Sequence, residues 1–192
     1  MAQSQKNRRL IVGISGASGV IYGVRLLEAL KDSGVESHLV ISKAAERTLA
    51  EETGFSPADV YAMADVHHPI KDIGASIASG SFETDGMLIA PCSVKTMSEI
   101  ATGVTSNLMS RAADVILKER RRLVLVVRET PFHLGHLRTM TQLSEMGAII
   151  APPLPAFYPG PETIDDIIDH SVGRALDLVG IKTSLVHRWT ED

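Results

Sequence analysis

The sequence is poor in cysteine: Cys92 is the single one among 192 residues. One cysteine excludes an internal disulfide and a zinc site built from several thiolates, and it fits a reducing compartment, so a cytoplasmic location is expected. No apolar run reaches the roughly 20 residues of a membrane-spanning helix. Residues 1–9 are polar and lack the apolar core of a secretory signal. We therefore expect no membrane partner.

An excess of charge of one sign is also missing. The formal net charge is −4, from 19 basic and 23 acidic residues that are mixed along the chain. This balance gives no broad positive field that would attract nucleic acid or an anionic membrane, so small molecules or proteins are the expected partners. The length suits a single domain over residues 1–192, with a core that needs neither disulfide nor metal.

What the sequence does contain is a repeated alternation of short apolar runs and helical patterns. Strands are predicted at residues 10–14, 38–41, 87–90, 123–127 and 148–151. Helices are predicted at residues 20–30, 43–52, 93–101 and near 134–146. Continuously apolar strands that alternate with helices are typical of a parallel sheet covered on both faces. The predicted fold is therefore α/β, a Rossmann-like doubly wound parallel sheet in three α/β/α layers.

Two segments break this alternation. Residues 55–82 are irregular, and we expect a surface excursion there with a short helix capped by Ser56. Residues 152–161 are too rich in proline for a helix or a central strand, so an ordered loop or a small lid is predicted.

The last predicted helix begins after Thr163, which is a suitable N-cap. Its apolar residues recur at helical spacing and predict one buried stripe, with Arg174 near the edge. The stripe consists of Ile164, Ile167, Ile168, Val172, Ala175, Leu176 and Val179. Asp165, Asp166 and Asp169 have the spacing of the aspartate-rich motif by which many prenyl synthases hold magnesium. We predict that they serve the start of the helix and bind no metal.

A glycine-rich turn at residues 13–19 joins the first strand to the first helix. Backbone N–H groups and a helix N-terminus at such a turn can hold a phosphate. Steric need alone also explains glycines in a tight turn, but the placement favours phosphate binding. A dinucleotide site further needs an acidic residue after the second strand, where this chain has Ser42 and Lys43. A mononucleotide such as FMN is thereby favoured over NAD.

Ser93 follows the third predicted strand and can cap the next helix, which would form a second wall of the nucleotide site or a plain helix cap. Cys92 beside it could be a nucleophile activated by the helix terminus, but a packed apolar thiol is the favoured interpretation.

Several charged residues follow the middle strands. Arg111 and Lys118 lie two turns apart on one predicted helix, and Arg128 and Glu129 stand at the carboxyl end of a buried strand, where open α/β sheets bind ligands. Residues 120–122 are basic and suit a solvated helix C-terminus. The histidines at 133 and 136 have helical spacing but lack a third ligand, so no metal is predicted.

With these residues identified, the chain strongly resembles the UbiX-type flavin prenyltransferases from residue 10 to residue 189. The resemblance rests on an ordered set of short motifs. They are Gly16-Ala17-Ser18-Gly19 with Tyr22-Gly23, Ile41-Ser42-Lys43-Ala44-Ala45, Pro91-Cys92-Ser93 with Thr96, Asn107-Leu108 with Arg111 to Val115, Leu117-Lys118-Glu119, Arg128-Glu129 with Pro131, and Phe157-Tyr158 leading to Arg174 and Trp189. Val127 departs from the family, which usually has proline there.

The resemblance implies a flavodoxin-like subunit of a homo-oligomer, a dodecamer. It would join a dimethylallyl group from dimethylallyl monophosphate to N5 and C6 of reduced FMN. The prenylated FMN would pass to a UbiD-type decarboxylase, in quinone synthesis or in phenolic acid breakdown.

The family's functional residues fall on matching positions of this chain. FMN would contact Gly16, Ala17, Ser18, Ser42, Ser93, Val94, Lys95, Thr96 and Arg128. The prenyl phosphate would be surrounded by Arg111, Lys118, Tyr158 and Arg174. Ser18 and Glu129 would lie near the reacting flavin atoms, Glu52 would reach in from a neighbouring subunit, and Trp189 would close the pocket.

This assignment is chemically coherent, because ionisation of an allylic phosphate needs cations on the leaving group and a π-rich wall around the carbocation. Forming the C6 bond also requires a base, either Glu129 or the released phosphate. Two alternatives stay open. An FMN-dependent cysteine decarboxylase of the same fold would need a catalytic histidine and an Asn-bearing substrate motif, which we do not find. A non-catalytic flavin carrier, or the accessory subunit of an aromatic acid decarboxylase, would not need the phosphate-facing residues Arg111, Lys118, Tyr158 and Arg174.

Overall fold

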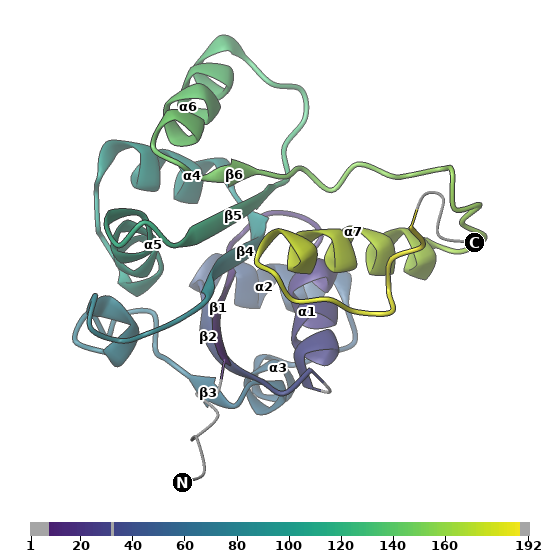
Figure 1. Ribbon diagram of the computed structural model, residues 1–192, viewed down its shortest axis with the longest axis horizontal. Coiled ribbons are helices and arrows are strands. Elements are labelled where there is room, and N and C mark those ends of the chain that lie inside the picture. The colour runs from purple at the N-terminus through teal and green to yellow at the C-terminus, as the bar shows by residue number, and fades with distance from the viewer. Residues whose placement is uncertain (1–7, 32, 189–192) are drawn as a thin grey trace, which may run out of the picture.

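The computed structural model describes residues 8–31 and 33–188. These residues form one six-stranded sheet in the order β3-β2-β1-β4-β5-β6, and every neighbouring pair is parallel (Figure 1). The strands are β1 (Arg8–Ile14), β2 (Val35–Ile41), β3 (Val66–His67), β4 (Gly86–Cys92), β5 (Arg122–Val127) and β6 (Ile149–Ile150). This is the strand order of doubly wound nucleotide-binding sheets, so the predicted fold class is confirmed.

The central strands read as continuous apolar runs because helices cover both faces of the sheet. On β4, Leu88 and Ala90 belong to one buried cluster, while Met87 and Ile89 belong to the other. Strands β1, β2, β4 and β5 therefore each supply side chains to two separate cores.

The helices divide between these two cores, as Figure 1 shows. Helices α1 (Ile21–Lys31), α2 (Lys43–Glu52), α3 (Pro57–Met63) and α7 (Ile164–Leu178) contribute to the first core. Helices α4 (Val94–Thr102), α5 (Leu108–Lys118) and α6 (Leu134–Glu145) contribute to the second. Within the described ranges, no helix is both long and apolar enough to span a bilayer.

The prediction for residues 55–82 holds only in part. Ser56 caps α3 as expected, with a capping box to Asp59. The rest is more than a surface excursion, because Val66–His67 pairs with β2 as an edge strand and Ile77 is buried. A two-residue strand is too short to leave a periodic pattern in a sequence.

Helix α7 begins as predicted, with Thr163 and Asp166 forming a capping box. The predicted stripe is buried from Ile168 onward, but the prediction was wrong for Ile164, which is 77% exposed. Beside it, Asp165 and Asp169 form ion pairs with Arg25 of α1, so polar contacts hold the first turn of α7 and the apolar contact starts one turn later.

Candidate functional site

Hydrogen bonds join the segments at the carboxyl ends of the neighbouring strands β1 and β4, at the point of the sheet where the order of the strands reverses. Ser15 is buried at this point, and its hydroxyl donates to the carbonyl of Pro91 at 3.0 Å and accepts from the backbone N–H of Ser93 at 2.7 Å. Its own N–H donates to the same carbonyl. The glycine turn and the Ser93 turn therefore form one fixed rim. Sequence reasoning missed Ser15, although it stands inside the glycine turn.

Three helices start at the cavity beside this rim. Ser42 caps α2 by accepting from the N–H of Ala45, and Ser93 caps α4 in the same way. Asn107 caps α5. All three caps line one cavity of about 690 Å³, a size usual for ligand sites. Helix N-termini favour anions, so a cavity lined by three of them is suited to a phosphate.

The cavity gathers most of the residues predicted to contact FMN. Its walls include Gly16, Ser42, Ser93, Val94, Lys95 and Thr96. Ala17, Ser18 and Arg128 lie outside this lining, and Ser18 and Arg128 are exposed. Asn107, Lys71 and Ile73 also line the cavity and were missed, because the segment that carries Lys71 and Ile73 has no regular pattern.

The glycine turn itself serves two purposes. A Cβ on Gly16 would lie 2.3 Å from the Cβ of Ala44, so glycine is needed there for α2 to pack on the turn. The N-terminus of α1 holds a carboxylate of the same chain, since Glu52 accepts from the N–H of Gly19 at 2.7 Å. In this chain Glu52 thus occupies the N-terminus of α1, whereas the N-caps of α2, α4 and α5 line the cavity, and phosphate binding by the glycine turn stays a prediction. A role of Glu52 in a neighbouring copy stays a prediction.

Arg128 and Glu129 lie directly after β5, at the same edge of the sheet. The N–H of Arg128 donates to the carbonyl of Cys92, and the Glu129 carboxylate accepts from the N–H of Thr130 at 2.9 Å. Burial raises the pKa of Tyr22, while the positive charge of Arg128 acts in the opposite direction. Val127 is buried and pairs with β4, so the valine extends the strand up to Arg128.

The Cys92 thiol is not suited to nucleophilic attack. The side chain is fully buried, and burial raises its pKa to about 12. It donates weakly to the carbonyl of Ser93 at 3.7 Å. The interpretation of Cys92 as a packed apolar side chain is confirmed.

The four residues predicted for the prenyl phosphate fall into two pairs. Arg111 and Lys118 lie on α5, where they bind Asp114 and Glu119.

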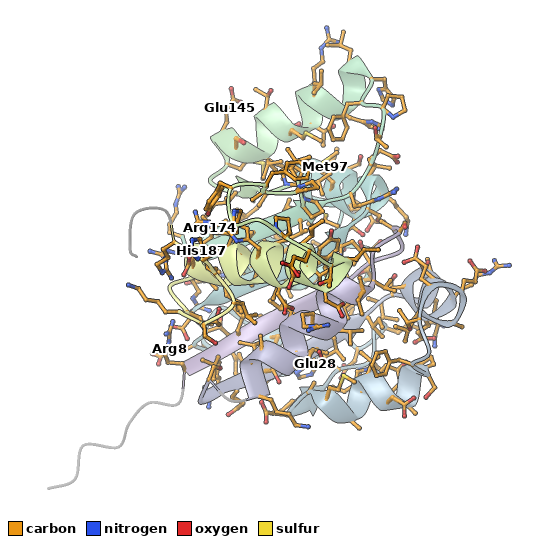
Figure 2. The ribbon with its side chains drawn as sticks, turned by 90° about the vertical axis from the view of Figure 1, so that its right-hand side faces the viewer. Arg8, Glu28, Met97, Glu145, Arg174 and His187 are labelled. Carbon is orange, nitrogen blue, oxygen red and sulfur yellow. The ribbon has the colours of Figure 1, made fainter. Side chains whose placement is uncertain are left out.

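The Arg174 guanidinium on α7 lies 2.9 Å from Asp177. Figure 2 labels Arg174 on α7 and His187 after it; the hydroxyl of Tyr158 donates to the carbonyl of His187, and its ring lies edge-on to His170 of α7. Because α5 and α7 cover opposite faces of the sheet, one chain does not bring the two pairs together. Trp189 lies outside the described residues.

A second cavity lies under the proline-rich loop, between α1 and α7. Its volume is about 160 Å³, and its walls are mainly apolar, with Tyr22, Val126, Pro152 and Leu154 on different sides. Arg174 and His170 also line it. Apolar cavities of about this size hold ligands such as benzene, so a short hydrocarbon group next to an anion fits here.

The acidic and histidine motifs have structural explanations. Asp166 accepts from the N–H groups of Glu162 and Thr163 at the start of α7. His133 caps α6 by accepting from the N–H of Gly135, and its ring lies on that of His136. Among residues 8–31 and 33–188, no cluster of three or more His, Cys, Asp or Glu could hold a metal ion.

Known proteins resemble this chain closely. The model of the family described as Flavoprotein matches residues 1–176. The flavin prenyltransferase UbiX of Escherichia coli K12 is 59% identical over 185 residues, which cover 95% of this chain and 98% of that protein. The crystal structure of AnUbiX (PadA1) in complex with FMN and dimethylallyl pyrophosphate is 50% identical, with a TM-score of 0.95 over 96% of this chain and 98% of its own. The crystal structure of a dodecameric FMN-dependent UbiX-like decarboxylase from E. coli O157:H7 is 51% identical, with a TM-score of 0.92. The match covers 95% of this chain and 99% of that chain.

Proposed function

The chain belongs to the flavoprotein family and, within it, to the UbiX flavin prenyltransferases, and we propose that it transfers a dimethylallyl group from dimethylallyl monophosphate to N5 and C6 of reduced FMN. The observation that carries this function is that the chain has two cavities of different chemistry. One is lined by three helix N-caps and suits a phosphate, and the other is a small apolar cavity with Arg174 in its wall. The product is prenylated FMN, which serves a UbiD-type decarboxylase.

The larger cavity is assigned to FMN. Its phosphate would lie at the caps Ser42 and Ser93, with Thr96 beside Ser93, because these N-termini carry partial positive charge. Gly16, Ala17, Ser18 and Arg128 would contact the rest of the molecule at the joined ends of β1, β4 and β5. Reduced FMN supplies the electron-rich ring that accepts the prenyl group.

The prenyl donor needs side chains from more than one copy of the chain. Arg111 and Lys118 of one copy would meet Tyr158 and Arg174 of another, and together these cations would neutralise the leaving phosphate. Large apolar side chains are exposed both around α6 and around the proline-rich loop, as expected of surfaces that are covered in an assembly. They include Phe132, Leu134, Leu137, Leu154, Phe157 and Ile164. We therefore assign the chain to a homododecamer, the state named for the E. coli O157:H7 structure.

The remaining catalytic assignments follow from position. Glu129 lies at the sheet edge where the flavin ring is expected, and either its carboxylate or the released phosphate would take the proton from C6. Ser18 is exposed at the same edge and can donate a hydrogen bond. Glu52 and Trp189 would complete the site, the first from a neighbouring copy and the second by closing the pocket.

This function is favoured over the two alternatives. A flavin carrier has no use for the apolar cavity next to Arg174. His133 serves as the N-cap of α6 and its ring lies on that of His136, so this pair has a structural explanation, and the sequence lacks the Asn-bearing substrate motif that a cysteine decarboxylase is expected to carry. We further propose that residues 1–192 act as a single domain in the cytoplasm.

The protein is expected to bind FMN at least about 100-fold more tightly than NAD, because Ser42 and Lys43 follow β2 where a dinucleotide site has a carboxylate for the adenosine ribose. Isothermal titration calorimetry with both ligands measures this difference. Riboflavin is the control, since it has the ring without the phosphate. Tight NAD binding with no FMN binding would remove the assignment of the larger cavity.

Prenyl transfer is expected to continue at an unchanged rate in EDTA, since Asp165 and Asp169 are paired with Arg25 and Asp166 caps α7. A monophosphate also carries less charge than a diphosphate, so the arginines and lysine can neutralise it without an ion. The assay is anaerobic, with EDTA and with added magnesium, alongside Asp166→Asn. Loss of turnover in EDTA, recovery with magnesium and the same loss in Asp166→Asn would move the aspartates into the active site.

A further inference from the structure

A chain of side-chain contacts connects α3 to the larger cavity through Glu46 on α2. The hydroxyl of Tyr61 donates to Oε1 of Glu46 at 2.5 Å. The ammonium of Lys43 donates to Oε1 at 3.0 Å and to Oε2 at 2.7 Å of the same carboxylate. Lys43 lines the cavity next to the cap Ser42. A residue distant from the cavity therefore helps to fix a cation at its wall.

The contacts differ in how far they are shielded from water. The side chain of Glu46 is 17% exposed, whereas that of Lys43 is 74% exposed. Burial raises the pKa of Glu46, but the hydrogen bonds from Lys43 and Tyr61 outweigh it and the net pKa is lowered, so the group is a carboxylate. Burial, together with Glu46, raises the pKa of Tyr61 to about 12. The phenol stays protonated and is a constant donor.

The position of the Tyr61 hydroxyl is set by its ring and its helix. The ring is stacked on His67 of β3, with the centroids 3.8 Å apart and the planes 12° from parallel. Helix α3 is anchored at its start by the capping box of Ser56 and Asp59. The hydroxyl is therefore aimed at Glu46 by groups that do not touch the cavity.

We propose that Tyr61 is a positioning residue for flavin phosphate recognition, because it holds Glu46, which in turn holds the Lys43 ammonium beside the α2 cap. This inference rests on the proposed function, which places the FMN phosphate at that cap. An ammonium has three N–H donors, and two are directed at Glu46, so one is left for a phosphate oxygen. The hydrogen bond from Tyr61 also takes up part of the negative charge of Glu46, which would otherwise repel the phosphate.

Tyr61→Phe tests the proposal, since it keeps the ring on His67 and removes only the hydroxyl. The dissociation constants of FMN and riboflavin are measured by the quenching of flavin fluorescence. FMN binding is expected to weaken about 10-fold and riboflavin binding to stay unchanged. Lys43→Met should give a loss of similar size. The double variant should lose little more than either single variant, because both changes break one linked contact.

Ala62→Gln is the matched control on the same helix. Ala62 is exposed and takes no part in the capping box, so the change leaves the contact between Tyr61 and Glu46 in place. Its ratio of FMN to riboflavin affinity is expected to equal that of the unchanged protein. The inference is overturned if Tyr61→Phe leaves the ratio of FMN to riboflavin affinity unaltered, whether or not both affinities fall. It is also overturned if Lys43→Met has no effect on FMN binding. If the protein without any substitution binds riboflavin as tightly as FMN, that result instead overturns the phosphate site of the proposed function.

Discussion

Glu129→Gln is expected to slow flavin prenylation by roughly 10²- to 10⁴-fold, the range of a lost general base, while FMN affinity stays within about 2-fold. The carboxylate follows β5 at the ligand-binding edge, and its hydrogen bond from the N–H of Thr130 can be kept by a glutamine oxygen. The fold and the flavin contacts should therefore survive. The measurement is an anaerobic single-turnover assay with reduced FMN and dimethylallyl monophosphate, followed by mass spectrometry of the flavin.

Glu145→Gln, at the exposed end of α6, is the control for a lost surface carboxylate. Its rate should equal that of the unchanged protein. An unchanged rate in Glu129→Gln would leave the released phosphate as the base. A parallel loss of FMN affinity would instead place Glu129 among the groups that bind the flavin.

The fold could be predicted because its main signals are local. Each central strand is buried on both faces and so reads as a continuous apolar run, and the N-caps Ser56 and Thr163 bond to N–H groups three residues away. Strand β3 has only two residues, and its place in the sheet depends on pairing with β2. That pairing is a tertiary contact, which a periodic pattern does not record.

The candidate site was predictable to a smaller extent. Ser42 and Ser93 stand directly after strands, where ligand sites in α/β sheets are expected. Asn107 follows an irregular segment, and its cap reaches the cavity only because α5 packs beside α4. The same limit applies to Glu52, whose bond to Gly19 spans 33 positions and occupies the N-terminus of α1. Contacts between distant segments decide which helix N-termini lie at the cavity.

Arg174→Gln is expected to lower kcat for prenyl transfer by roughly 10²- to 10³-fold, as for the loss of one donor to a developing anion. Arg174 lines the small apolar cavity, and its guanidinium also pairs with Asp177, which Arg188 holds as well. Asp177 therefore keeps a cationic partner in the variant, and the fold should persist. The assay is steady-state prenylation at saturating reduced FMN. Arg47→Gln, an exposed arginine that lines neither cavity, serves as the control.

The same variant tests whether the site is shared between copies. Arg111 and Arg174 lie in opposite layers of one chain, so a site that uses both must take them from different copies. Arg111→Gln is expected to be as slow as Arg174→Gln. When the two inactive variants are unfolded together and reassembled, about one quarter of the mixed sites would carry both intact arginines. Activity should return to about a quarter of that of the unchanged protein, whereas variants reassembled separately stay inactive. No recovery in a mixed assembly, verified by native mass spectrometry, would show that the two arginines do not serve one shared site.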